Sequence, residues 1–447
     1  MPFRISTRSS FFQIYTRPMH TILLVGQLGC GEKETTEEEP IFHGNGYSFR
    51  SAEECAECHA EIVEEWKLSP HATTALNPIY TKMSEKFMRD RGVEFTSTTC
   101  TGCHMPGGVI MGEPALLPYE QRSTLAKEGV TCDVCHTADT YPEEIMGEFD
   151  SIRLTFAKSD VVFTSHEAPS TQEAREYHEV RQNPLIRAPE MCIGCHDQHY
   201  SYYDSPADQF DITCTDCHMT TTPGVPFSGV LSHQVVGLGY SYEYAIKDAP
   251  NREELMAKQE EWASRAMKIE DVIRVDNENS TIVLVEIENL FNAHWLPSVG
   301  AVNNIRQMWI EISVWDASDT LIFSSGYLDA QSDLCDEFSR EVQLGRIEID
   351  EQLWTFQTID MTHVLGEQYP VCLSIDSAGV HLDNSLYPNE KLEIQYSLPF
   401  LDTQENIFVE VNILQRHYTP YMLRDLGLDN MVDQIHTLTM ESWTGAL

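Results

Sequence analysis

The sequence predicts a mixed fold, in which a mainly α-helical and irregular region is followed by an all-β domain. One short pattern of cysteine and histidine occurs five times between residues 55 and 218, where strand patterns are nearly absent. From about residue 272 onward, apolar residues recur with a period of two, which is typical of β-strands. The 447 residues are enough for two domains.

Each copy of the repeated pattern reads C-x-x-C-H, the attachment signature of c-type haem. Two thiols form thioethers with the haem vinyl groups, and the adjacent histidine ligates the iron. The copies are Cys55, Cys58 and His59; Cys100, Cys103 and His104; Cys132, Cys135 and His136; Cys192, Cys195 and His196; and Cys214, Cys217 and His218. Zinc sites are the alternative, but zinc takes four ligands in nearby pairs, and the five identical histidines then have no role. The sequence therefore predicts five covalent haems c.

We place a pentahaem cytochrome c domain at residues 43–240. Five haems in so short a region leave little room for an ordinary side-chain core. We therefore expect the haems themselves to form the core, with short helices and long loops around them.

The group in the second axial position of each iron decides between an electron relay and a catalytic haem. The candidates are His43, His71, His166, His178, His199, His233 and His294. If the chain after the first motif is helical, His71 lies about 18 Å from His59, so it ligates a different haem. His199 follows His196 by three residues, so it ligates a neighbouring haem or lies at the surface or at a propionate. The remaining histidines are expected to be ordinary side chains of the β domain: His363, His381, His417 and His436.

A connector helix is expected at 251–268, between the two domains. Asn251 can cap it, with Glu254 at the capping-box position. One face of this helix carries Leu255, Gln259, Trp262 and Ala266. An all-β sandwich domain is expected at 272–420. Its strand candidates are 282–288, 308–315, 320–324, 353–359, 392–398 and 407–413.

Two features of the β region leave alternatives open. Cys335 and Cys372 form a disulfide in an oxidising compartment or remain two buried thiols. The C-terminal segment 421–447 has a mixed pattern and is assigned to no domain.

The N-terminus has the features of an export signal, which agrees with haem attachment outside the cytoplasm. Residues 1–30 combine three arginines, a short apolar stretch and Cys30. A cysteine in this position resembles a lipoprotein signal. We expect Cys30 to be lipidated, with simple signal cleavage or a retained anchor as alternatives. An acidic linker follows at 31–42, and the location is periplasmic or at the cell surface, on the outer membrane.

The net charge of −41, from 29 basic and 70 acidic residues, restricts the partners. Such a chain repels nucleic acid and anionic lipid. We expect redox proteins with basic docking patches, no nucleic acid, and membrane contact only through a lipid on Cys30. The sequence does not indicate an oligomeric state.

Several segments carry a family resemblance. The run from Trp66 through Ser69 to His71 resembles the opening of the multihaem cytochrome c family that contains hydroxylamine oxidoreductase, tetrathionate reductase and small electron-carrier relatives. Residues 129–137, 178–196 and 214–237 resemble later motifs of that family, which implies that His178 and His233 are distal ligands. Residues 289–297 resemble a signature of the sandwich appended to many such cytochromes. This implies His294 as a ligand, with a structural turn histidine as the alternative.

The resemblance, which covers roughly residues 43–420, favours an electron relay whose haems are mostly bis-histidine. The alternative is an oxidoreductase with one open haem that acts on a small nitrogen or sulfur oxyanion or on hydroxylamine. Such relatives usually carry more haems or a C-x-x-C-K motif, and this sequence has neither. A haem filament or a sensor is a third class. No catalytic residue is predicted.

Overall fold

The structure, a computed structural model, describes most of the chain after the predicted signal and linker. The described residues are 46–92, 100–114, 117–142, 152–158, 160–165, 177–196, 202–203, 205–220, 231–293, 295–297, 306–364, 367–370, 380–399 and 406–447. Several residues singled out by the sequence lie outside them: Cys30, His43, His166, His199, His294 and Cys372.

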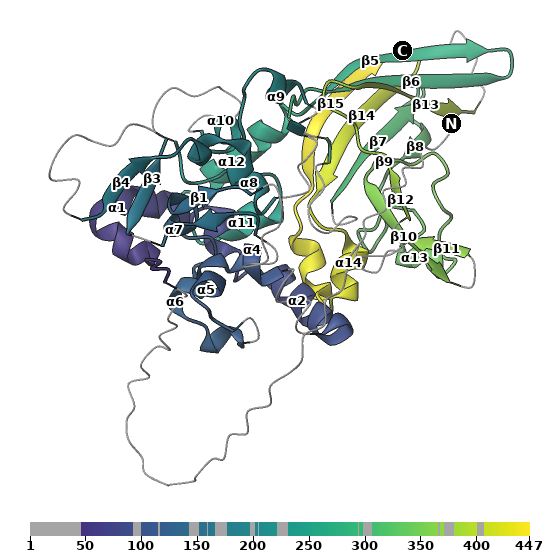
Figure 1. Ribbon diagram of the computed structural model, residues 1–447. Helices are drawn as coiled ribbons and strands as arrows, with labels where there is room; N and C mark the ends of the chain where they lie inside the picture. Colours follow the sequence, from purple (N-terminus) through teal and green to yellow (C-terminus); the bar gives the residue numbers. More distant parts are fainter. Residues whose placement is uncertain are drawn as a thin grey trace, which may run out of the picture.

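Short helices joined by irregular segments form the half of the molecule that carries the five motifs (Figure 1, left). The two longest are α1 (Ala52–Lys67) and α2 (Pro78–Arg91). The shorter ones are η1 (Pro70–Thr73), α4 (Gly102–His104), α5 (Pro106–Ile110), η3 (Tyr119–Gln121), α6 (Thr124–Lys127), α7 (Cys132–His136), η5 (Pro184–Arg187), α8 (Pro189–Ile193), α9 (Pro206–Gln209), α10 (Cys214–His218) and α11 (Tyr240–Ala245).

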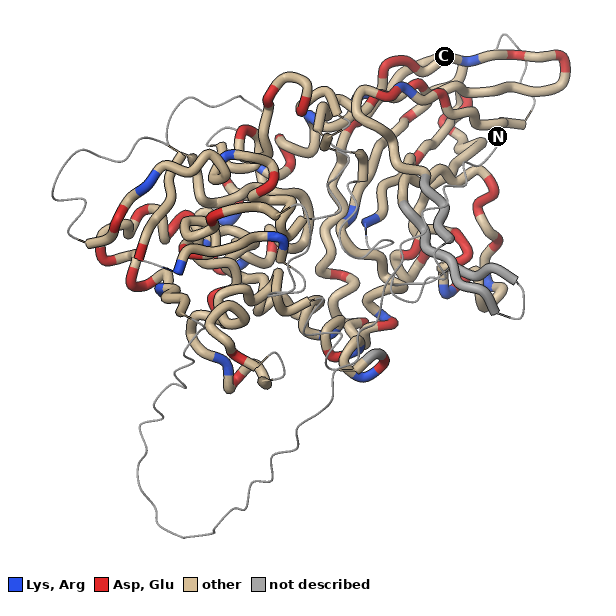
Figure 2. The backbone as a smooth tube through the Cα atoms, viewed as in Figure 1, with Lys and Arg blue, Asp and Glu red and all other residues tan. Residues whose placement is uncertain are grey.

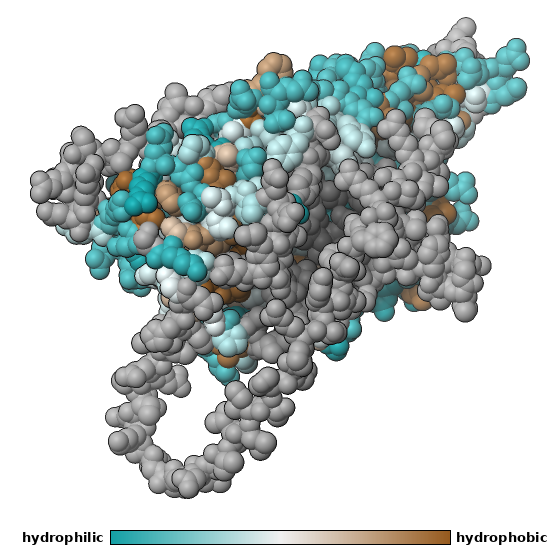
Figure 3. Space-filling view, viewed as in Figure 1, coloured by the Kyte–Doolittle hydropathy of each residue, from teal (hydrophilic) through white to brown (hydrophobic). Residues whose placement is uncertain are grey.

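Buried apolar side chains in the motif half fall into several small clusters, whereas one large cluster fills the β half. Apolar side chains also reach the surface over the motif half on the face shown in Figure 3. Among the described residues, side chains therefore give this half several small cores, one of them shared with residues 418–431.

Local sequence explains the course of α1. Ser51 caps it, and the Glu54 carboxylate accepts a hydrogen bond from the Ser51 amide at 2.8 Å, which completes a capping box. The helix is kinked at His59 (φ −118°, ψ 39°). It ends at Lys67, and η1 begins at Pro70, whose missing amide hydrogen suits the first position of a new helix.

The motif half also contains four short strands that the sequence did not predict. They are β1 (Ala138–Thr140), β2 (Thr155–Phe156), β3 (Val161–Thr164) and β4 (Glu179–Gln182). β1 pairs with β2 in an antiparallel arrangement, and β3 pairs with β4 in a parallel one. Strands of two to four residues are too short to show a clear alternation in sequence.

The predicted connector is α12 (Arg252–Ala263), which is shorter than expected at its C-terminal end. The Asn251 side chain makes no capping hydrogen bond, so that part of the prediction is wrong. Its backbone (φ −106°, ψ 30°) is not in the extended conformation that an N-cap needs. Leu255, Gln259 and Trp262 are buried. The Gln259 side-chain amide donates to the carbonyls of Gly237 and Gly239, both at 3.2 Å, which ties α12 to the motif half.

In the described residues, the β half contains three antiparallel sheets. The first has the order β13-β6-β5, with β5 (Met267–Asn277), β6 (Ser280–Asn289) and β13 (Lys391–Leu398). The second has the order β15-β14-β7-β8, with β9 beside β7: β7 (Gln307–Trp315), β8 (Leu321–Ser325), β9 (Trp354–Phe356), β14 (Phe408–Arg416) and β15 (Leu438–Ala446). The third, β11-β10-β12, contains β10 (Thr358–Val364), β11 (Glu367–Pro370) and β12 (Val380–Asp383).

One apolar cluster is shared by the first two sheets. Alternate residues of β7 and β14, such as Ile310, Ile312 and Val411, are fully buried in it. The mixed α and β character of the fold is thereby confirmed. The unassigned C-terminal segment contains α14 (Pro420–Asp425), η8 (Asp429–Gln434) and β15, and β15 pairs with β14 as an edge strand of the second sheet. The remaining helix is α13 (Arg340–Gln343).

Acidic positions are spread over both halves (Figure 2). None of the helices in the described ranges has the length and apolar composition needed to cross a bilayer.

Candidate haem-binding site

Each motif lies in or beside one turn of helix. The first lies within α1, the third and fifth coincide with α7 and α10, and α4 and α8 contain parts of the second and fourth. Residues three apart share one face of a helix, so the two thiols of a motif point the same way. Both thiols can therefore attach one ring.

Thiols of different motifs lie close together. In three pairs each thiol is near enough to shift the pKa of the other: Cys55 with Cys132, Cys103 with Cys195, and Cys192 with Cys214. Cys135 of the third motif also acts electrostatically on both thiols of the fourth. The first motif therefore adjoins the third, the third adjoins the fourth, and the fourth adjoins both the second and the fifth. This spatial order differs from the sequence order.

Two histidines outside the motifs lie opposite motif histidines at equal distances. The ring centres of His71 and His196 are 6.3 Å apart, and those of His136 and His233 are also 6.3 Å apart. Two metal–nitrogen bonds of about 2 Å, each extended by about 1 Å from nitrogen to ring centre, span about 6 Å. Each pair is thus spaced like two imidazoles that share one metal ion.

His178 is the third of these distal candidates within the described chain. It lies close enough to the first-motif His59 for the two imidazoles to interact electrostatically. Burial, followed by the positive charge of Arg50, lowers the pKa of His178.

Backbone carbonyls orient three of the motif histidines. Nδ1 of His104 lies 3.3 Å from the Thr74 carbonyl oxygen, and Nδ1 of His136 lies 2.9 Å from that of Phe163. Nδ1 of His218 lies 2.9 Å from the Val236 carbonyl oxygen. A carbonyl oxygen only accepts, so Nδ1 carries the hydrogen, and Nε2 of the neutral ring keeps its lone pair for a metal.

Two of the motif histidines, His104 and His196, are also kept neutral near pH 7. Burial lowers the pKa of His104 to about 4. Burial, with added repulsion from His71 and His218, lowers that of His196 to about 3. Near neutral pH the rings therefore carry no proton on the nitrogen that would bind iron.

His71, His104 and His218 are partly buried, whereas His196 keeps more exposed surface. The ring spacings and the hydrogen-bonded imidazoles fit a haem group beside the motif thiols. The residues present therefore match the cofactor that the sequence predicts.

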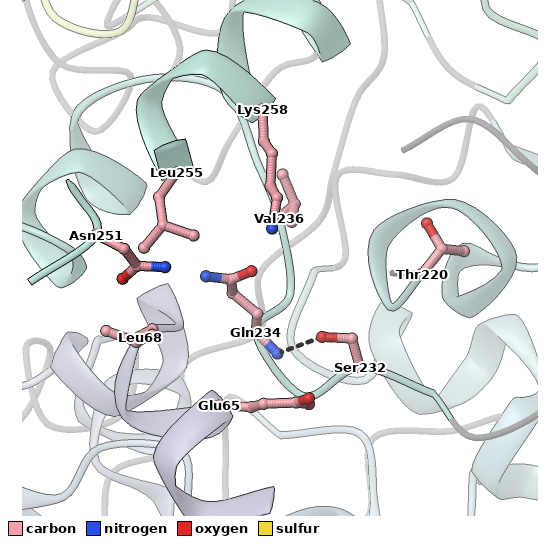
Figure 4. A pocket seen from close by; sticks show the side chains of 9 residues that line it. All are labelled: Glu65, Leu68, Thr220, Ser232, Gln234, Val236, Asn251, Leu255 and Lys258. Carbon is pink, nitrogen blue, oxygen red and sulfur yellow. Dashed lines mark hydrogen bonds between the residues drawn. The ribbon is translucent and has the colours of Figure 1, made fainter. Parts of the chain in front are cut away.

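A partly open hollow of about 200 Å³ lies beside the His233 segment (Figure 4). Its lining comes from α1, α12 and the chain around His233: Glu65, Leu68, Thr220, Ser232, Gln234, Val236, Asn251, Leu255 and Lys258. The Glu65 carboxylate also accepts a hydrogen bond from the His233 amide at 2.9 Å, which fixes the backbone that carries this ring. Leu68, Val236 and Leu255 are its apolar lining residues, and the other six are polar or charged.

Aromatic side chains also support two of these motif histidines. Tyr80 stacks on His104 with ring centres 3.9 Å apart and an interplanar angle of 9°. Trp262 of α12 meets His218 edge-on, with centres 4.8 Å apart. These contacts limit the rotation of both imidazoles.

His417 has an environment that the sequence did not reveal. It is buried, and its Nδ1 lies 3.1 Å from the Leu238 carbonyl oxygen, as in the three motif histidines above. A side chain at Gly239 would collide with the His417 ring, with contacts from 2.4 Å. His417 was expected to be an ordinary β-domain residue, and no local pattern marks it. Its role depends on packing between segments that are distant in sequence.

Part of the chain is similar to a known protein family. Residues 54–137, which contain three of the motifs, match the family described as cytochrome c554 and c-prime. No curated protein matches.

Among solved structures, a penta-heme cytochrome c552 from Thermochromatium tepidum resembles the whole fold, with a TM-score of 0.61 and 16% sequence identity. The similarity covers 89% of this chain and 99% of that chain. At this identity the likeness concerns the fold. Together with the motifs and the histidine pairs, the comparisons support a multihaem cytochrome c that transfers electrons.

Proposed function

We propose that the protein is an electron relay that holds five covalent haems, most of them between two histidines. The observation that carries this proposal is the spacing of 6.3 Å in both the His71–His196 and His136–His233 pairs. His178 with His59 would form a third pair. A bound haem would supply an iron that alternates between the ferric and ferrous states.

The chain's own residues would fix the rings and exclude water. The proximity of thiols from different motifs supports short paths from ring to ring. The Thr74, Phe163 and Val236 carbonyls hold Nδ1 of their histidines, so the ring orientation and the free Nε2 need no rearrangement when an electron arrives.

The first motif is the best candidate for the point where electrons enter or leave. Cys58 is exposed, whereas the other motif cysteines are partly buried, and His59 is exposed, as is His196 of the fourth motif. Exposed carboxylates surround the first motif on α1: Glu53, Glu54, Glu57, Glu61 and Glu64. A redox partner with a basic docking face is the complementary match.

Export and a lipid on Cys30 remain part of the proposal, supported by the sequence of residues 1–30. Membrane fractionation at high salt tests this arrangement. A Cys30→Ser variant should move to the soluble fraction, and its retention with membranes would contradict lipid attachment.

The competing function is an oxidoreductase with one open haem. The second motif is the place to examine, because Tyr80 rather than an imidazole is the described ring that stacks on His104. Mass spectrometry should find five haems on the matured protein, and titration with cyanide and carbon monoxide should then find no binding. One bound ligand per molecule would favour the oxidoreductase, and four or fewer haems would contradict the pentahaem relay.

A further inference from the structure

The end of the β7–β14 ladder brings a cation toward the motif half. In this antiparallel ladder Gln307 lies opposite Arg416, so Arg306 and His417 are the next residues at the same end. The Arg416 guanidinium donates to Gln307 Oε1 at 2.8 Å and lies over the Trp309 ring at 5.3 Å. These contacts fix the backbone from which Arg306 extends.

This end of the ladder is packed against the chain that follows the fifth motif. His417 Nδ1 binds the Leu238 carbonyl at 3.1 Å, and the rings of Tyr418 and Tyr240 lie 5.8 Å apart. The Val236 carbonyl, two residues before Leu238, holds His218. The β half therefore places Arg306 near the segment that holds the fifth-motif histidine, His218.

Arg306 lies near enough to three histidines from separate parts of the chain to help lower their pKa values. They are His196, His218 and His417. Arg306 itself is partly buried, like His71 and His218. Burial lowers its pKa, but an arginine begins so high that it stays charged at neutral pH.

We propose that Arg306 is a fixed interior cation that raises the reduction potentials of the haems on His196 and His218. This inference rests on the proposed function as a multihaem relay. Reduction adds one electron to each iron, and a nearby positive charge stabilises the reduced form, more strongly in the interior than in water. Arg306 acts through the field at the haems and is a positioning residue for electrons rather than a catalytic one.

The first motif has the opposite electrostatic setting. The nearby Arg50 forms an ion pair with Asp133 at 2.9 Å, which offsets its charge, and α1 adds exposed carboxylates. The relay would thus have its lower potentials at the exposed first motif and its higher potentials at the fourth and fifth. Electrons that enter at α1 would therefore reside mainly on the haems of the fourth and fifth motifs, next to the β half.

Potentiometric titration of the full-length holoprotein tests the inference. Arg306→Gln removes the charge, Arg306→Lys keeps it, and Arg346→Gln removes an exposed charge that pairs with Glu341 in the β half. We expect two of the five midpoint potentials to fall in Arg306→Gln, and all five to be kept in Arg306→Lys and Arg346→Gln. Unchanged potentials in Arg306→Gln, an equal shift of all five, or the same fall in Arg306→Lys would overturn it.

A spectroscopic label identifies the affected haem. In a His71→Ala background the haem on His196 should become high-spin, and its signal can be followed separately during the titration. Adding Arg306→Gln should lower the potential at which this signal disappears, and a constant potential would contradict the inference. Haem content is measured first on the wild type and on every variant. A wild type without five haems would contradict the proposed function, whereas an Arg306→Gln variant with five haems and unshifted potentials would contradict only the role of Arg306.

Discussion

The imidazole rings of His71 and His196 lie 6.3 Å apart, although His71 follows the first motif and His196 ends the fourth. The Pro70 helix η1 presents His71 to a motif other than the one that precedes it in sequence. An axial pair of this kind would tie the N-terminal helix to the middle of the motif half, so ligation and folding are coupled.

Removal of a distal histidine should therefore change one haem and leave the others. His71→Ala, His178→Ala and His233→Ala should each convert one low-spin haem of five to the high-spin form, observed by electron paramagnetic resonance. His436→Ala is the control, because His436 pairs with Glu243 and has no motif histidine beside it among the described contacts. A fully low-spin spectrum for His178→Ala would show that its assignment is wrong.

Gly129→Ala should displace His71. Gly129 has φ +74°, and a Cβ there would lie 2.4 Å from both the His71 carbonyl oxygen and Thr74 Oγ1. Gly427 is the matched control, since it has φ +70° and open space around its Cβ position. The positive φ costs each alanine variant about 1–2 kcal/mol. Only Gly129→Ala adds the collision, so its melting temperature should fall further, with a rise in high-spin signal. Equal falls in both variants would contradict the packing account.

Asp336→Asn should change how stability depends on pH. Burial, with added repulsion from Glu337 and Asp333, raises the pKa of Asp336 to about 7. The unfolded chain loses this proton near pH 4 and the folded protein near pH 7, so the wild type loses stability between these values as pH rises. Asparagine keeps the acceptor for the Phe338 amide without ionising. The difference in urea midpoint, variant minus wild type, should therefore increase between pH 4 and pH 7. A constant difference would show that Asp336 ionises normally.

Electron transfer from a basic small redox protein should slow as salt rises, because the Debye length falls from about 30 Å at 0.01 M to about 10 Å at 0.1 M. An acidic donor should speed up over the same range. If docking occurs at α1, replacing Glu57 and Glu61 by Gln should weaken the salt effect for the basic donor. Glu278→Gln, in the turn between β5 and β6, should change it little (Figure 1). If the stopped-flow electron-transfer rates do not depend on salt concentration with either donor, the negative charge serves only solubility.

The sequence predicted those parts of the fold that depend on local pattern. β6, β7, β13 and β14 lie where apolar residues alternate, because one face of each strand packs on the shared core. β15 was missed because only its first residues alternate between buried and exposed positions. β5 was missed in part because charged residues and a bulge between Ile269 and Asp271 interrupt its pattern.

The residues of the five motifs could be predicted from sequence as well, because haem attachment requires a fixed spacing of the two cysteines and the histidine. The distal pairings depend on contacts between distant segments, so spacing could show only that His71 faces a motif other than its own. Arg306 and His417 gave no signal, since their positions result from the register of β7 against β14. His43, His199 and His294 lie outside the described residues and stay predictions.

Low-temperature electron paramagnetic resonance of the oxidised protein, with haem quantitation on the same sample, tests the central claim most directly. Five haems per chain, with low-spin signals typical of paired imidazoles, are the predicted result. A high-spin ferric signal that accounts for about one haem in five would contradict a relay in which every haem iron has two axial ligands. It would identify one haem with an open axial position.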